Sequence, residues 1–105
     1  MNRRTSPRAK VDLLVNRFLN GSPYVCRVTD ISATGLRLQP LLEPLTPPRF
    51  MGLQLELPGT GAIVTASAEI VDGAGTRDGG RGIGVRFTRI GPESERALRR
   101  FVEAN

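Results

Sequence analysis

Residues 24–38 read YVCRVTDISATGLRL, which is a strand, a turn and a second strand in one short stretch. Residues 24–31 are rich in β-branched side chains and predict the first of these strands. The small residues SATG at 32–35 predict the turn, and residues 36–38 predict a short strand after it. Because a turn this short joins neighbouring antiparallel strands, the stretch favours an all-β fold.

Strands and turns alternate on both sides of this stretch. Upstream, Val11, Leu13 and Val15 occupy every second position and the rhythm continues at Phe18, which predicts a strand over 11–18. Downstream, the pattern predicts strands over 50–57, 62–71 and 83–87, a turn at 58–61 and a glycine-rich loop at 72–82. Residues 39–49 hold four prolines, which cannot donate to a sheet, and are therefore expected to form a surface loop.

The C-terminal segment has the pattern of a helix. Pro92 fits a first helical position, and Glu93 and Glu95 are favoured in a first turn. Ala97, Leu98, Phe101 and Val102 then form an apolar stripe, so we expect this helix to pack on the sheet or to cover a barrel mouth.

Together these elements predict a single domain, a small six-stranded antiparallel β-barrel plus a C-terminal α-helix. The expected organisation is a basic N-terminal arm over 1–10, a barrel over 11–90 and the helix over 91–105. Four aromatic residues fit core positions: Phe18, Phe50, Phe87 and Phe101.

The charge is concentrated at the N-terminus. The chain has 105 residues with 15 Lys plus Arg against 10 Asp plus Glu, and the first ten residues carry Arg3, Arg4, Arg8 and Lys10 without an acid. A basic arm on a nearly neutral body indicates either an anionic partner or a solvated tail.

The residue types present argue against an enzyme. There is no His to act as a base, and Asp30, Glu56 and Glu69 fall on separate predicted strands. We expect no catalytic residue and no metal site. Cys26 is the only cysteine, so it forms no internal disulfide, and its apolar neighbours predict a buried, inert thiol.

The chain is expected to be cytoplasmic and not inserted in a membrane. No apolar run reaches the 18 residues of a membrane span, and Asp12, Asn16 and Arg17 interrupt the stretch that follows the basic start.

Two motifs carry chemistry: Arg4-Thr5-Ser6-Pro7-Arg8 in the arm, and DISATG at residues 30–35. Arginine pairs with the first spacing also occur at 77/81 and 96/100, so RxxxR alone is uninformative, whereas Asp-x-Ser-x-x-Gly is rare by chance. In this order, the motifs resemble the PilZ domain family, with RxxxR followed by [D/N]xSxxG. Residues 82–87, GIGVRF, also resemble the closing strand of that family.

The resemblance implies a bacterial receptor that binds cyclic di-GMP and needs no other cofactor. It assigns Arg4 and Arg8 to guanine and phosphate contacts and Asp30, Ser32 and Gly35 to the guanine side, with Arg3 as an auxiliary. The chemistry agrees, because a carboxylate can accept from the N1–H and N2 amine of guanine, and a guanidinium grips O6, N7 or phosphate. The expected partners are this ligand and an unidentified protein effector, in a pathway of motility, surface polysaccharide or development.

Two alternatives stay open. The first is a PilZ-like adaptor that does not bind cyclic di-GMP and contacts proteins through the 39–49 loop and the helix face. The second is a small basic barrel that binds RNA or single-stranded DNA, which is disfavoured because the aromatics fit core positions and the charge lies in an arm. We therefore expect no nucleic acid polymer as partner.

Overall fold

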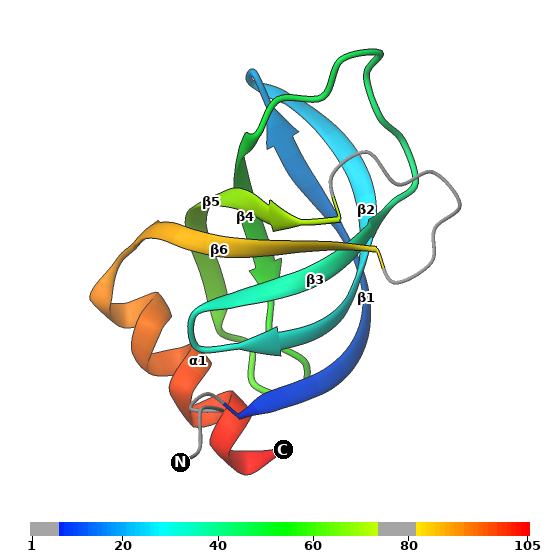
Figure 1. Ribbon diagram of the computed structural model, residues 1–105. Helices are drawn as coiled ribbons and strands as arrows, with labels where there is room; N and C mark the ends of the chain where they lie inside the picture. Colours follow the sequence, from blue (N-terminus) through cyan, green and yellow to red (C-terminus); the bar gives the residue numbers. More distant parts are fainter. Residues whose placement is uncertain (1–6, 74–81) are drawn as a thin grey trace, which may run out of the picture.

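The computed structural model describes residues 7–73 and 82–105, and over these ranges the strands form a closed antiparallel barrel in the order β1-β2-β3-β6-β5-β4 (Figure 1). The elements are β1 (Arg8–Leu19), β2 (Ser22–Ser32), β3 (Gly35–Pro40), β4 (Phe50–Glu56), β5 (Ile63–Asp72), β6 (Ile83–Ile90) and α1 (Pro92–Ala104). This confirms the predicted fold class, a six-stranded barrel followed by a helix.

The first strand starts earlier than the sequence pattern indicates. β1 begins at Arg8 and pairs with β2 from its first residue, with Arg8 opposite Ser32 and Lys10 opposite Asp30. Its hairpin closes at Asn20 and Gly21, whose φ angles of 52° and 85° suit the tight turn between two twisted strands. Arg8 and Lys10, expected in a free arm, are therefore part of the barrel wall.

The inward face of β1 carries an arginine. Strand alternation turns Ala9, Val11 and Val15 inward, and the next inward position is Arg17, not Phe18. Arg17 is completely buried, Nη2 donates to the Leu42 carbonyl at 3.1 Å, and Nη2 lies 3.6 Å from Glu43 Oε1. Its Nε has no hydrogen-bond partner among the described residues. The predicted core role of Phe18 is thus wrong, and Phe18 lies half-buried on the outward face.

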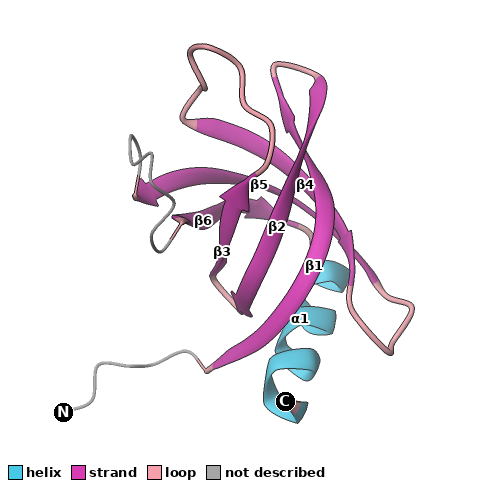
Figure 2. Ribbon diagram, turned by 90° about the vertical axis from the view of Figure 1, so that its right-hand side faces the viewer, coloured by secondary structure: helices cyan, strands magenta, loops and turns pink. Residues whose placement is uncertain are grey.

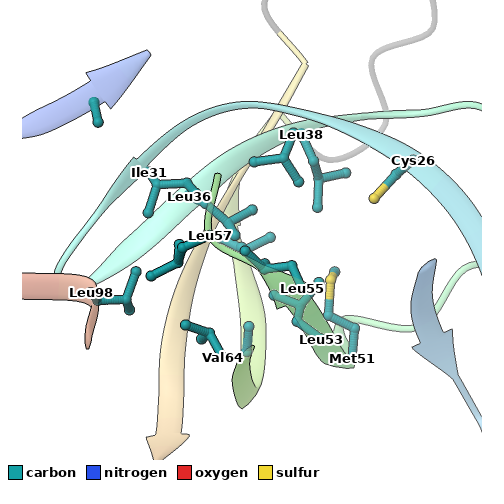
Figure 3. Packing of buried hydrophobic residues seen from close by; sticks show 14 of the residues in the cluster. Cys26, Ile31, Leu36, Leu38, Met51, Leu53, Leu55, Leu57, Val64 and Leu98 are labelled. Carbon is teal, nitrogen blue, oxygen red and sulfur yellow. The ribbon is translucent and has the colours of Figure 1, made fainter. Parts of the chain in front are cut away.

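Buried apolar side chains from the strands and α1 fill the barrel (Figure 3), including Ile31, Leu36, Leu38, Leu53 and Leu98. Phe101 belongs to this core as predicted, and Phe87 packs against it half-buried. Phe50 does not, because it is opposite Glu69 on the outward face and is 60% exposed.

Cys26 is the buried thiol that the sequence predicts. Desolvation raises its pKa from 9.0 to about 11, although the nearby Arg17 guanidinium acts in the opposite direction. Because the thiolate is the reactive form, this cysteine is chemically inert at neutral pH.

Helix α1 covers one end of the barrel, where it contacts β1, β2 and β5 (Figure 2). Its buried residues Leu98, Phe101 and Val102 complete the core, which confirms the predicted packing role. No helix in the described part of the chain is long and apolar enough to span a bilayer.

Closure of the barrel depends on a short seam. β1 pairs with β4 only at Asn16–Gln54, Arg17–Leu53 and Phe18–Gly52, whereas its pairing with β2 runs along most of the strand. The end of β1 that carries Arg8 is consequently joined to the barrel mainly through β2.

Candidate ligand-binding site

Arg8 and Asp30 meet on the outward face of β1 and β2. Arg8 donates from Nε at 3.0 Å and from Nη2 at 2.8 Å to the same oxygen, Asp30 Oδ1. Both side chains remain accessible, with 49% of Arg8 and 23% of Asp30 exposed. The barrel thus places a guanidinium fork and a carboxylate side by side at its surface.

Ser32 lies at the end of β2 and is buried. Its Oγ accepts hydrogen bonds from the backbone N–H groups of Thr34 and Gly35, each at 3.2 Å, and lies 3.2 Å from the Gly35 carbonyl. A serine that satisfies the backbone of a tight turn in this way fixes the conformation of the turn. In this structure the hydroxyl is committed to the turn that follows Asp30.

Gly35 is required by close approach to the neighbouring strand. A Cβ atom at this position would lie 2.1 Å from the backbone oxygen of Val85, so any larger residue would push β3 away from β6. The turn is also joined to β6 through the Phe87 N–H, which donates to the Thr34 carbonyl at 2.9 Å. Gly35 is not among the glycines with positive φ, so packing of β3 against β6 is the reason that the structure shows for this residue.

Further cations surround Asp30. Lys10 is opposite Asp30 on β1, is exposed, and forms no ion pair within the residues that the structure describes. Arg37 is opposite Asp30 on β3, where it bonds to Asp72 at 3.2 Å. Lys10 was not predicted as a site residue because it is not part of the RxxxR motif. Side chains two positions apart on a strand share a face, so its spacing from Arg8 is the signal that could have identified it.

The remaining predicted residues, Arg3 and Arg4, lie outside the described residues. Of the predicted set, the structure brings together Arg8, Asp30, Ser32 and Gly35 at one end of β1, β2 and β3. A partly exposed carboxylate that is paired with Arg8 and lies opposite Lys10 and Arg37 can bind a ligand that combines hydrogen-bond donors with negative charge, as a guanine nucleotide does.

The other carboxylates considered for catalysis are kept apart. Asp30, Glu56 and Glu69 lie on β2, β4 and β5, and Glu69 forms ion pairs with Arg49 and Arg86. Among residues 7–73 and 82–105, no group of three or more His, Cys, Asp or Glu side chains could hold a metal ion.

Comparison with known proteins addresses the fold and the family. A family model described as PilZ domain matches residues 2–104. Among solved structures, the chain is similar to the Bacillus subtilis inhibitor of motility (MotI/DgrA), with 16% sequence identity and a TM-score of 0.78. The match covers 99% of this chain and 51% of that protein, so this chain spans about half its length. A comparison with curated protein sequences finds no match.

Proposed function

The chain belongs to the PilZ domain family, a family of binding and adaptor domains, and from that premise we propose that it is a bacterial receptor for cyclic di-GMP. The observation that carries the proposal is the solvent-accessible Arg8–Asp30 pair beside the 32–35 turn that Ser32 holds. Binding changes which protein the receptor contacts, and the process regulated is motility, surface polysaccharide or development.

Asp30 is the acceptor for the guanine edge. Both hydrogen bonds from Arg8 end on Oδ1, which leaves Oδ2 to accept from the N1–H and N2 amine of guanine. Two hydrogen bonds hold Arg8 to Asp30, so its guanidinium is oriented before the ligand arrives and loses little entropy on binding.

Ser32 and Gly35 contribute the turn against which the guanine lies. Arg4 and the auxiliary Arg3 approach from the N-terminal segment, and with Arg8 they neutralise the two phosphates of the ligand. Each of the two phosphodiesters of the ligand carries one negative charge, so the two motif arginines can balance both.

The test is isothermal titration with cyclic di-GMP at physiological salt, with GMP as a ligand control. We expect saturable binding that Arg8→Ala and Asp30→Ala each weaken by at least about 30-fold, since each removes a charged hydrogen bond worth about 2 kcal/mol.

Arg27→Ala is the matched control variant. Arg27 on β2 pairs with Asp12 on β1, so it forms the same kind of cross-strand pair on the same two strands but away from the 30–35 turn. Its removal is expected to leave binding unchanged. Absence of binding by the wild-type protein at high ligand concentration would refute the receptor proposal.

A second candidate function is an adaptor that does not bind the nucleotide. It is favoured by Leu41, Leu42 and Leu45 in the proline-rich loop, which are 50%, 59% and 102% exposed. The first two are held in place, since their N–H groups donate to the Val25 carbonyl and Arg17 binds the Leu42 carbonyl. Fixed, exposed leucines of this kind are typical of protein contact surfaces.

A further inference from the structure

A groove of about 680 Å³ lies on the outer wall of the barrel, away from Arg8 and Asp30. It is bounded by β4 and β5, by the end of β6 and by the first turn of α1, which follows β6 directly (Figure 1). Its walls include Phe18, Gly52, Ser67, Arg89, Ile90 and Pro92. It shares no residue with the proposed cyclic di-GMP site.

One rung of the sheet forms the centre of the groove. In register across four strands, Phe18 pairs with Gly52, Gly52 with Ser67, and Ser67 with Arg89. Directly opposed residues point to the same face of the sheet. The Phe18 ring and the Arg89 guanidinium therefore lie at the two ends of this row, and the two residues between them, Gly52 and Ser67, have small side chains or none. With strands about 4.8 Å apart, these ends are separated by about 14 Å.

The fold does not require the glycine that creates this space. A Cβ atom at Gly52 would meet only Phe18 Cβ, at 3.6 Å, which is an ordinary van der Waals contact. The φ angle of Gly52 is also outside the positive range that favours glycine. The hollow is therefore free to serve a bound group, unlike Gly35, where packing alone explains the residue.

Arg89 is the cationic side chain of the groove. The other described arginines of the barrel strands, at positions 8, 17, 27, 37 and 86, each lie within 4.0 Å of a carboxylate, whereas Arg89 forms no ion pair among the described residues. Glu93 lines the same groove without pairing to it. The exposed guanidinium beside apolar walls is complementary to a carboxylate attached to an apolar group.

We propose that this groove binds an extended segment of a partner protein, with a bulky apolar side chain over Gly52 and an acidic side chain at Arg89. The apolar residue packs against Phe18 and Ile90, and the carboxylate accepts from the guanidinium. Gly52 and Arg89 are two strands apart, which is about 9.6 Å, and side chains two residues apart on an extended peptide lie about 7 Å apart on one face. The lengths of the arginine and acidic side chains can bridge the remaining difference. The recognised pattern is therefore apolar-x-acidic. The inference does not depend on cyclic di-GMP binding.

The experiment is selection of random 12-residue peptides displayed on phage against the full chain, followed by fluorescence anisotropy with the best peptide. We expect the selected sequences to share the apolar-x-acidic pattern. Gly52→Leu, which fills the groove, and Arg89→Glu, which reverses its charge, are each expected to weaken the peptide at least about tenfold.

Arg100→Glu provides the matched control. It makes the same charge change on the exposed face of α1, outside the groove, and is expected to leave peptide affinity unchanged. Thermal melts and cyclic di-GMP titration of Gly52→Leu separate loss of the groove from loss of the fold. If Gly52→Leu does not fold, Ser67→Leu fills the same rung from β5.

Three results would overturn the proposal. The selection yields no sequence, or the selected peptides lack the acidic residue, or they bind the Gly52→Leu protein as well as the wild type. Light scattering adds a fourth: a wild-type dimer that Gly52→Leu converts to monomer would show that a second copy of the chain fills the groove.

Discussion

Two arginines on β1 occupy opposite environments. Arg8, at the start of the strand, faces outward, is half-exposed and pairs with Asp30, while Arg17, near its end, faces inward and is completely buried. Both form an ion pair, yet the physical meaning differs. An exposed pair contributes about 0 to 1 kcal/mol to stability. Removing the completely buried Arg17 side chain leaves a cavity and the Leu42 carbonyl without its donor, and costs several kcal/mol, although Glu43 is itself 34% exposed.

The difference in burial between Arg8 and Arg17 indicates which of the two arginines is available to bind a ligand. Arg8 can exchange its partner or add a ligand at small cost to the fold, because water already surrounds it. Arg17 holds the proline-rich loop to the barrel through Leu42 and Glu43 and cannot move without exposing the core. One strand thus carries a residue for binding and a residue for structure.

The strongest test of this comparison is Arg17→Ala. We expect a loss of about 3 kcal/mol in the free energy of unfolding, since the change leaves a cavity and removes the contacts that hold Leu42. Urea unfolding measures the stability, and titration should show cyclic di-GMP affinity unchanged within about twofold. A large drop in affinity would break the division between the two arginines.

Arg17→Met serves as its control. Methionine fills much of the same volume without a charge to desolvate, and Arg17 Nε has no partner to lose in the described structure. Stability close to that of the wild type would show that volume, more than charge, is what the barrel needs at this position.

The second prediction concerns the pH dependence that Cys26 gives to stability; Cys26 lies on β2, opposite Val15 of β1. The folded state raises the pKa of Cys26 from 9.0 to about 11, so the unfolded chain loses this proton first as pH rises. Stability is therefore fully present below about pH 9 and falls by about 2 kcal/mol as the pH approaches 11. Urea midpoints of wild type and Cys26→Ala across this range isolate the effect, because only the wild type has the thiol; parallel curves would contradict it.

The third prediction sharpens the role of Arg8. Arg8→Lys keeps the charge but loses the planar fork that donates twice to Asp30. We expect about tenfold weaker cyclic di-GMP binding and unfolding midpoints within error of the wild type. Wild-type affinity in this variant would mean that charge alone is sufficient.

The smallest effect is expected from Lys10→Gln. Lys10 is exposed opposite Asp30 and contributes positive potential without a fixed hydrogen bond, so its loss should weaken binding about threefold at physiological salt. The difference from wild type should shrink as salt is raised. An effect that persists in high salt would indicate direct contact with the ligand.

Much of the fold could be predicted because a strand with one buried face places apolar residues at every second position of the sequence. Alternation, β-branched content and turn residues together located every strand, and Pro92 and the acidic first turn located α1. The wrong predictions of core residues occur where a charged residue occupies an inward position or an aromatic residue occupies an outward one. Arg17 is a charged residue at an inward position, so the pattern placed Phe18 in the core in its stead. Phe50 is an aromatic residue of the kind found in cores, but the register of β4 turns it outward.

The residues of the candidate site could be predicted from the sequence, but the contacts that they form could not. The DISATG motif identified Asp30, Ser32 and Gly35, but the assignment of Ser32 to the turn and of Gly35 to contact with β6 depends on neighbours distant in sequence. The Arg8–Asp30 pair depends likewise on strand register. The groove at Gly52 had no local signal, because its rung joins four strands.

The short seam between β1 and β4 affects the order in which the strands pair during folding and the local opening of the native state. The β1–β2 hairpin closes over a tight turn and can form early, whereas the seam joins distant segments through three residue pairs. We expect this pairing to form last during folding, and we expect its backbone amide hydrogens to be the first in the sheet to exchange with solvent. Transient opening there would release β1 from β4 while β2 still holds it, and because Arg17 lies in the seam, each opening would also expose the core around this residue.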